Sequence, residues 1–380
     1  GTVWTTSAFA AGTGTWSLAW APGLVRFARD YVGGVAHGEW RQYALSGDLV
    51  DRAGFASGIR DGARSLGNDR SMRIEETWRL GNLTGRRRLW RRGTLQIDER
   101  YGADGRRDGE FATWRSVREQ REQGGYAQGA RDGAWTWFDR DGQVERTGAY
   151  RGGRRVGRWQ RFERGVLREE MTYRDDLLDG DVIAWGPSRQ EWGRSRLRRG
   201  SGVLRTWHQR SVVADESTWQ DGKRHGPYRA YSPRGRVLIE GQYADDARDG
   251  TWRWQLPPQG AGAGAERQAA VWSETWKRGV RDGRSVFAMG DRERRAQEYA
   301  HGLRHGAFMA AHPNGAPAVV GQFAQDQRDG VWTSYDPSGQ MRSQATYRAG
   351  LLHGVSRQWR ADGTLLAEQV FAQGVLTGPV

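Results

Sequence analysis

Residues 126–135 read Tyr126-Ala-Gln-Gly129-Ala-Arg-Asp-Gly133-Ala-Trp135. Residues 323–332 read Phe323-Ala-Gln-Asp-Gln-Arg-Asp-Gly330-Val-Trp332, with aromatic, Gly or Asp, Gly and aromatic residues at the same four positions. In both copies another Gly follows nine residues after the third of these positions. Recurrence of one pattern at distant places in a chain is the signature of a repeat protein.

The same frame recurs along nearly the whole chain. Between residues 9 and 371 its first position appears 16 times, at an average interval of about 24 residues. These first positions are Phe9, Tyr31, Phe55, Trp78, Tyr101, Tyr126, Tyr150, Tyr173, Leu197, Trp219, Tyr243, Trp276, Tyr299, Phe323, Tyr347 and Phe371. We therefore expect residues 1–380 to form a single continuous array of about 15 repeats. The longest interval, from 243 to 276, holds a Pro/Gly/Ala stretch that predicts an extended hairpin loop at residues 255–271.

Each repeat reads as a β-hairpin. Residues 134–138 and 143–150 have strand length, and the turn residues Asp139-Arg-Asp-Gly142 separate them. The repeats headed by Phe9 and Leu197 are shorter, and we expect their turns to have lost two residues. Gly and Asp at the connections supply positive φ or side-chain turn bonds at little steric cost. The fold class that follows is all-β: tandem hairpins in an elongated, twisted, single-layer antiparallel sheet.

Composition limits the possible functions and compartments. The 380 residues carry 59 Lys+Arg and 45 Asp+Glu, a net charge of +14, with 37% hydrophobic residues and no Cys. Without Cys there is no disulfide framework, thiol nucleophile or Cys-based zinc site. No apolar run has the length of a membrane span, and the chain opens on Gly1 without the charged and apolar regions of a signal peptide. We expect a processed periplasmic or exported protein, with the cytoplasm as the alternative.

The repeat frame resembles the MORN repeat (membrane occupation and recognition nexus) in its bacterial variant, Gly-x-Trp-x-x-Tyr-x-x-x-Gly. It is clearest in Gly38-Glu-Trp40-Arg-Gln-Tyr43, Gly157-Arg-Trp159-Gln-Arg-Phe162, Gly226-Pro-Tyr228-Arg-Ala-Tyr231 and Gly330-Val-Trp332-Thr-Ser-Tyr335. The resemblance covers about the whole chain and weakens at residues 185–207 and at the long loop. It implies stacked antiparallel hairpins. Bacterial members of the family are often labelled antitoxins or immunity proteins, and eukaryotic members serve as scaffolds near membranes.

Two residue types dominate the candidate binding chemistry. Aromatic residues three apart, such as Trp40 and Tyr43 or Trp332 and Tyr335, point to opposite faces of a regular strand and mainly supply cross-strand packing. Only Lys223 and Lys277 are lysines, so 57 of the 59 basic residues are Arg. Arg stacks on aromatic rings in ways that Lys does not, which is one explanation of this excess. The other is a basic surface for an acidic protein or anionic lipid; nucleic acid is disfavoured because no recognised binding module is present.

The titratable residues that recur do not suggest catalysis. His37, His225, His305 and His353 each precede a repeat Gly, a position that holds Asp in six other repeats. A residue that recurs in every unit builds the unit, whereas a catalytic group is normally singular. The sequence also lacks a Gly-x-x-x-x-Gly-Lys-Ser/Thr phosphate loop, a Gly-x-Ser-x-Gly elbow and a His-Glu-x-x-His pair. We expect no catalytic residues, no cofactor and no metal.

The places where the repeat breaks are better candidates for function, because insertions in repeat proteins often map to the binding face. One is the irregular region 185–207, and the other is the long loop with its flanking residues. The predicted partner-binding residues are Trp185, Trp192, Arg194, Arg196, Arg198, Arg199, Trp207, Trp254, Leu256 and Trp272. The first functional hypothesis is an immunity or antitoxin protein that binds and neutralises a toxic effector. The alternative is a structural scaffold or envelope-associated protein that touches anionic lipid headgroups.

Overall fold

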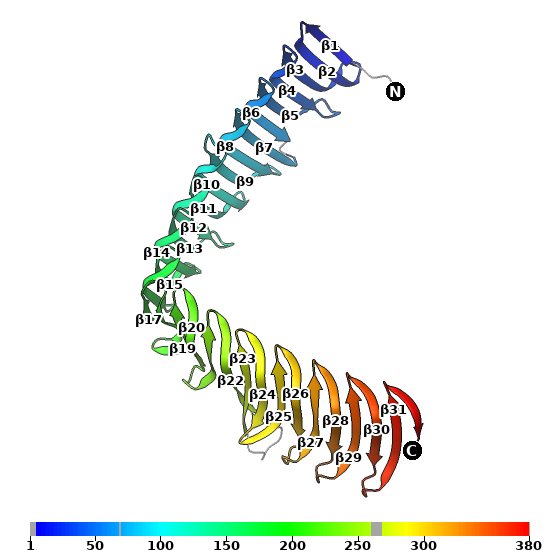
Figure 1. Cartoon of the computed structure of the whole chain (residues 1–380). Coiled ribbons are helices and arrows are strands. Elements are labelled where there is room, and N and C mark those ends of the chain that lie inside the picture. The colour runs from blue at the N-terminus through cyan, green and yellow to red at the C-terminus, as the bar shows by residue number, and fades with distance from the viewer. Residues whose placement is uncertain (1–4, 68–69, 260–267, 380) are drawn as a thin grey trace. The chain divides into compact units, whose positions relative to one another are not determined.

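The computed structural model describes residues 5–67, 70–259 and 268–379 (Figure 1). Within these residues all helix or strand is β-strand, arranged as two antiparallel sheets of 17 and 15 strands. The all-β hairpin prediction is therefore confirmed. The chain divides into two compact units, Gly1–Glu191 and Trp192–Val380, and the single continuous array stays a prediction across that boundary. No described residues form a helix long and apolar enough to cross a membrane.

From β1 to β16 and from β18 to β32 each strand pairs with the next strand along the chain. The first sheet contains β1 (Thr5–Ala10), β2 (Thr13–Ala21), β3 (Leu24–Val32), β4 (Val35–Tyr43), β5 (Leu49–Ala56), β6 (Ile59–Gly67), β7 (Met72–Arg79), β8 (Asn82–Arg91), β9 (Thr94–Tyr101), β10 (Arg107–Ser116), β11 (Glu119–Ala127), β12 (Ala130–Phe138), β13 (Val144–Arg151), β14 (Arg154–Glu163), β15 (Val166–Arg174), β16 (Leu177–Trp185) and β17 (Glu191–Leu197). The second contains β18 (Gly202–Gln209), β19 (Val212–Gln220), β20 (Lys223–Tyr231), β21 (Val237–Ala244), β22 (Ala247–Gln259), β23 (Gln268–Lys277), β24 (Val280–Met289), β25 (Arg292–Ala300), β26 (Leu303–Ala311), β27 (Pro317–Ala324), β28 (Gln327–Tyr335), β29 (Met341–Arg348), β30 (Leu351–Trp359), β31 (Leu365–Ala372) and β32 (Val375–Pro379).

Two-residue turns with positive φ at both positions close most hairpins on one edge of each sheet. Gln128 (φ 49) and Gly129 (φ 85) form such a turn between β11 and β12. Turns of this type match the right-handed twist of the flanking strands, and a Gly at the second position adopts positive φ without strain. Gly129 is thus a turn residue, as the sequence predicts, whereas Gly133, predicted to end the same turn, lies inside β12.

The prediction for the shortened repeats is wrong in detail. The repeat headed by Phe9 keeps its two-residue turn, with Ala11 at φ 48 and Gly12 at φ 76. What it lacks is a bulge, because the β1–β2 register runs without a shift. In β11 and β12, by contrast, Gly125 pairs with Asp132 and Gln123 with Thr136, so β12 carries extra residues at the Asp-Gly step. A bulge of this kind bends the strand that contains it.

Neighbouring turns are tied together by hydrogen bonds along the edge. The N–H of Gly153 donates to the carbonyl of Arg131 at 2.8 Å, and the N–H of Gly152 donates to the Asp132 carboxylate at 3.0 Å. The recurring Asp before the repeat Gly is therefore a cap for the next turn. This use supports the structural interpretation of these carboxylates.

In three other turns the capping carboxylate belongs to the turn itself and not to the preceding hairpin. Asp176, Asp246 and Asp326 take the second turn position, and each follows a hairpin that has Val or His in place of the capping Asp. Asp326 accepts hydrogen bonds from the backbone N–H and the Nε of Arg304 at 2.9 and 3.1 Å. The backbone bond, followed by the guanidinium, lowers the pKa of Asp326, and Arg224 does the same for Asp246. Burial opposes the shift at Asp176, where the bonds from Arg155 still lower the pKa.

These carboxylates predict a loss of stability in acid. A carboxylate whose pKa is lower in the folded chain contributes fully above its unfolded pKa of about 3.9, and the contribution is lost as the pH falls through the folded pKa. We expect Asp246→Asn/Asp326→Asn to have a lower thermal midpoint than the unmodified chain at neutral pH. Between neutral pH and about pH 3 the thermal midpoint of the variant should fall less than that of the unmodified chain. The control is Asp221→Asn, since no hydrogen bond or ion pair of the Asp221 carboxylate occurs among the described residues. Equal pH dependence in the two variants would contradict the prediction.

The core of each unit lies on one face of its sheet, which we call the stacking face. It is defined by Trp135 and Trp159 in the first unit and by Trp252 and Trp332 in the second, with exposed fractions of 6% or less. Each of these indoles covers a glycine of the preceding strand, and a Cβ there would lie less than 3.0 Å from ring atoms. The covered glycines are Gly124, Gly148, Gly241 and Gly321. Glycine inside a strand here marks a close approach rather than a turn.

Arginines cover the outer side of these rings. The guanidinium of Arg131 lies 4.2 Å from the Trp135 ring centroid, and Arg328 lies 4.5 Å from that of Trp332. Both arginines stand two residues before a repeat Gly. Stacking on aromatic rings, one of the two explanations for the Arg excess, therefore accounts for a recurring set of arginines.

In the middle of the first sheet, charged residues replace the aromatic row. Arg87 and Glu99 form a cross-strand pair at the positions that Trp135 and Gly148 hold two repeats later. Glu99 is fully buried, and its carboxylate lies 2.7 Å from both Arg87 and Arg107. Arg87 also bonds Glu76 at 3.0 Å. These residues form a buried ion-pair row within the stacking face.

Candidate functional site

The opposite side of the second sheet carries alternating charge and is called the polar face here. Five residues in register on successive strands define it: Arg205, Glu216, Arg229, Glu240 and Arg253. Glu216 lies 3.3 Å from Arg205, and Glu240 lies 3.4 Å from Arg253. Tyr228 contacts the Trp252 ring on the stacking face, whereas the Tyr231 hydroxyl reaches Glu216 on the polar face. The predicted opposite orientation of aromatic residues three apart is confirmed at this repeat.

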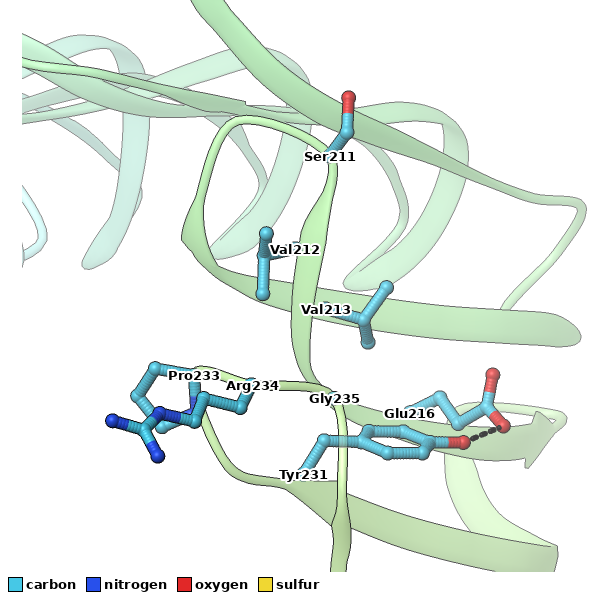
Figure 2. A pocket seen from close by; sticks show the side chains of 8 residues that line it. All are labelled: Ser211, Val212, Val213, Glu216, Tyr231, Pro233, Arg234 and Gly235. Atoms are coloured by element: carbon cyan, nitrogen blue, oxygen red, sulfur yellow. Dashed lines mark hydrogen bonds between the residues drawn. The ribbon is translucent and has the colours of Figure 1, made fainter.

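A pocket of about 490 Å³ opens at the edge of the polar face, between the β18–β19 and β20–β21 turns. Figure 2 shows Val212 and Val213 facing Pro233 and the ring of Tyr231, with Glu216 at one end. The pocket arises from a step in turn length. The β18–β19 connection has two residues, whereas residues 232–236 form a longer turn closed by the Ser232 N–H to the Arg236 carbonyl at 2.8 Å.

The polar end of the pocket is internally paired. The Tyr231 hydroxyl donates to Glu216 Oε1 at 2.7 Å, and Arg205 Nε lies 3.3 Å from Glu216 Oε2. Burial, and then the hydrogen bond and charge of Glu216, raise the pKa of Tyr231, so this hydroxyl stays protonated and keeps donating. The pocket thus combines apolar walls, an aromatic face and one carboxylate. A pocket of this size and composition suits a single side chain or small ligand.

The predicted partner-binding residues of the irregular region 185–207 are divided between the two units. Trp185 ends β16 in the first unit, whereas the other members belong to the second. Trp207 packs on Gly193, repeating the indole-on-glycine contact of the stacking face. Arg194, Arg196, Arg198 and Arg199 are exposed along β17 and its turn, where Arg198 bridges to Ser201. Trp192 is half-buried, and its carbonyl accepts the Ser211 N–H next to the pocket.

The predicted partner-binding residues that flank the long loop, Trp254, Leu256 and Trp272, lie together on the stacking face. Trp254 and Trp272 form a cross-strand pair, and Leu256 pairs with the fully buried Ala270. The strands continue into the segment predicted as a loop, since Gln259 pairs with Gln268. Residues 260–267 of the predicted loop lie outside the described residues. Backbone pairing between the flanking aromatic segments thus extends further than the Pro and Gly content suggests.

The pocket residues were not among the sequence-based candidates. Val212 and Tyr231 occupy ordinary repeat positions, and nothing in either residue alone signals a cavity. The detectable signal is the step from a two-residue connection to the longer turn Ser232-Pro-Arg-Gly235, which sets a short turn beside a long one. Three consecutive arginines, Arg86, Arg87 and Arg88, are ion-paired to Asp98, Glu76, Glu99 and Glu75, so the Arg excess does not make an unpaired basic surface there.

Two segments match the family model of the MORN repeat variant, residues 131–151 and 328–349. The repeats there are of the MORN type. Both segments contain an Arg-Asp-Gly bulge and an indole on the stacking face. The chain is thus built from β-hairpin repeats, an architecture of repeat-based binding proteins. The match does not extend to the antitoxin or immunity variant.

No curated protein matches the sequence. Among solved structures, the TcdB2-TccC3-Cdc42 complex matches at 10% identity over 95% of this chain and 25% of that chain, with a TM-score of 0.16. This chain spans about a quarter of that one. BamB from Moraxella catarrhalis matches at 12% identity (95% and 94% coverage, TM-score 0.17), and a eukaryotic initiation factor at 10% (88% and 96%, TM-score 0.20). TM-scores this low carry no argument about fold or function.

Proposed function

We propose that the chain is a non-catalytic protein-binding repeat protein, and that its partner is a toxic effector which it neutralises by binding. The supporting observation is how the recurring side chains are used. Recurring arginines stack on indoles and recurring aspartates cap turns, so their chemistry serves the fold. The features left for another molecule are the non-recurring ones, above all the pocket between the β18–β19 and β20–β21 turns.

The alternating charges of the polar face also suit a protein partner. Arg205, Glu216 and Arg229 form a row whose charges are paired within the sheet, which leaves a polar surface without strong net charge. Complementary charge across an interface sets the register of docking and excludes wrong partners. A row of paired charges distinguishes one protein partner from another by where the partner's own charges lie, and a dedicated inhibitor needs such specificity.

The test is capture of the partner followed by a functional readout. Immobilised full-length chain is mixed with extract of the source organism at about 0.05 M and 0.5 M salt, and bound proteins are identified by mass spectrometry. We expect one stoichiometric partner retained at high salt, whose activity falls when the purified chain is added and whose toxicity is relieved by co-expression. A partner that keeps full activity in the complex would refute neutralisation while leaving protein binding intact.

A scaffold on anionic lipid is the second candidate, favoured by the turn edge of the first unit. Val35, Ile59 and Leu80 are 45%, 48% and 73% exposed on this edge. Val35 and Ile59 lie against the glycines of the next turns, so the three side chains follow one another along the edge. Apolar side chains with Arg nearby, here Arg79, suit a headgroup surface. Co-sedimentation with phosphatidylserine vesicles, lost at high salt and in Ile59→Ser/Leu80→Ser, would favour this function over neutralisation.

A further inference from the structure

Another junction in the second unit shows what fills the space that is open in Figure 2. Residues 212–235 align with residues 292–315 without a gap, and both segments begin after a two-residue turn and end in a Pro-x-Gly turn. At the second junction Arg294 Nη1 donates to the carbonyls of His312 and Pro313 at 2.5 and 2.6 Å. Arg292 Nη1 donates to the carbonyl of Asn314 at 2.9 Å. Two guanidinium groups therefore occupy the step between the short and long turns.

The pocket junction has lost both arginines. Val212 stands at the position of Arg292 and Ala214 at that of Arg294, so neither side chain reaches the next turn. The equivalent carbonyls belong to Ser232, Pro233 and Arg234. Among the described residues no side chain donates to the carbonyls of Pro233 and Arg234. Backbone carbonyls that accept guanidinium donors at the second junction thus have no side-chain donor at the pocket junction among the described residues.

The pocket junction has also gained groups that suit a cation. Glu216 and Tyr231 stand where the second junction has Ala296 and Ala311. They add to the carbonyls an aromatic ring and a carboxylate, which Arg205 and Arg229 share from the sheet. Val212, Val213 and Pro233 supply walls for a methylene chain. Carboxylate, aromatic face and apolar walls are the three environments that an arginine side chain uses at interfaces.

We propose that this pocket binds an arginine side chain presented by the protein partner, in the place that Arg292 and Arg294 fill from within the chain at the second junction. The inference rests on the proposed protein-binding function and names the anchor residue of that partner. The guanidinium donates to Glu216 and to the carbonyls of Pro233 and Arg234, and its stem lies along the two valines.

The test uses the full chain with labelled valine methyl groups and Nα-acetyl-arginine amide as the probe. We expect saturable shifts of the Val212 and Val213 resonances, with a dissociation constant on the order of 1 mM, and about tenfold weaker binding in Glu216→Gln. Val212→Arg/Ala214→Arg refills the pocket as the second junction does and abolishes the Val213 shift at unchanged thermal midpoint. The matched control, Arg292→Val/Arg294→Ala, leaves the Val213 titration unchanged. Absence of saturable shifts, or equal affinity for Nα-acetyl-tryptophan amide, overturns the proposal.

The captured partner gives an independent readout. Its affinity for Val212→Arg/Ala214→Arg should fall at least tenfold relative to the unmodified chain. Full retention of affinity overturns the pocket as the docking site but leaves the proposed function standing. Failure of the unmodified chain to capture any partner would count against the proposed function alone, since the amide titration decides the pocket by itself.

Discussion

Replacing Gly148 by Ala is expected to destabilise the middle of the first unit by about 3 kcal/mol, the upper end of the usual cost of overpacking. The added Cβ would overlap three ring atoms of Trp159, which is 4% exposed. Gly148 has no positive φ, so the penalty is steric rather than conformational. The indole cannot retreat, because Tyr150 and Trp137 rings lie 5.1 and 5.7 Å from its centroid. Urea unfolding together with hydrogen exchange of peptides from residues 134–163 measures the loss.

The control for this substitution is Gly378→Ala in β32. Gly378 also lacks positive φ, but a Cβ there meets no atom within 4 Å. A Gly to Ala change at an unobstructed site is expected to stabilise by about 0.4–1 kcal/mol through the unfolded chain. The same small effect at both positions would show that the indole-on-glycine contact does not organise the stacking face.

The hairpins and turns could be predicted because their determinants are local. Gly129 and its equivalents adopt positive φ in two-residue turns, and a few neighbouring residues are enough to predict such a turn. Asp139 caps its own turn by accepting the N–H groups of Asp141 and Gln143. The strand glycines Gly124 and Gly148 belong to the same sequence, yet their partners Trp135 and Trp159 are known only once the register is known. Register here depends on the bulges that most strand pairs contain, and the sequence frame does not say which pairs lack one.

The pocket could not be predicted for a related reason. It requires two neighbouring connections of different length and the simultaneous absence of the long side chains that fill the same step elsewhere. Each condition is visible in the sequence, at residues 210–211 and 232–236 and at Val212. That these conditions leave a pocket is evident only from the second junction, where Arg292 and Arg294 donate to the carbonyls of the long turn. The pocket is thus a difference between two repeats of the chain and not a property of either repeat alone.

The second large effect is expected at Glu99. Removing the carboxylate in Glu99→Ala leaves Arg87 and Arg107 without the acid that they share, and breaking a buried ion pair typically costs about 3–5 kcal/mol. Arg107 is 41% exposed and Arg87 keeps Glu76, so we expect the lower end, about 3 kcal/mol. Thermal and urea unfolding of the full chain measure the change.

The ion-pair row also predicts a rescue. Arg87 stands at the position of Trp135, and Glu76 on the preceding strand stands at the position of Gly124, which the Trp135 indole covers. Because Arg87 and Glu76 form an ion pair there, Arg87→Trp/Glu76→Gly installs the indole-on-glycine pair of the later repeat. An apolar pair that replaces a buried ion pair is often neutral or stabilising, so the double variant should lie within about 1 kcal/mol of the unmodified chain. The single variant Arg87→Trp, which buries an indole against an intact Glu76, should be less stable than the double variant. If the double variant is instead the least stable of the three, the two kinds of pair are not interchangeable, and the charged row has a role in its own stretch of the sheet that packing alone does not supply.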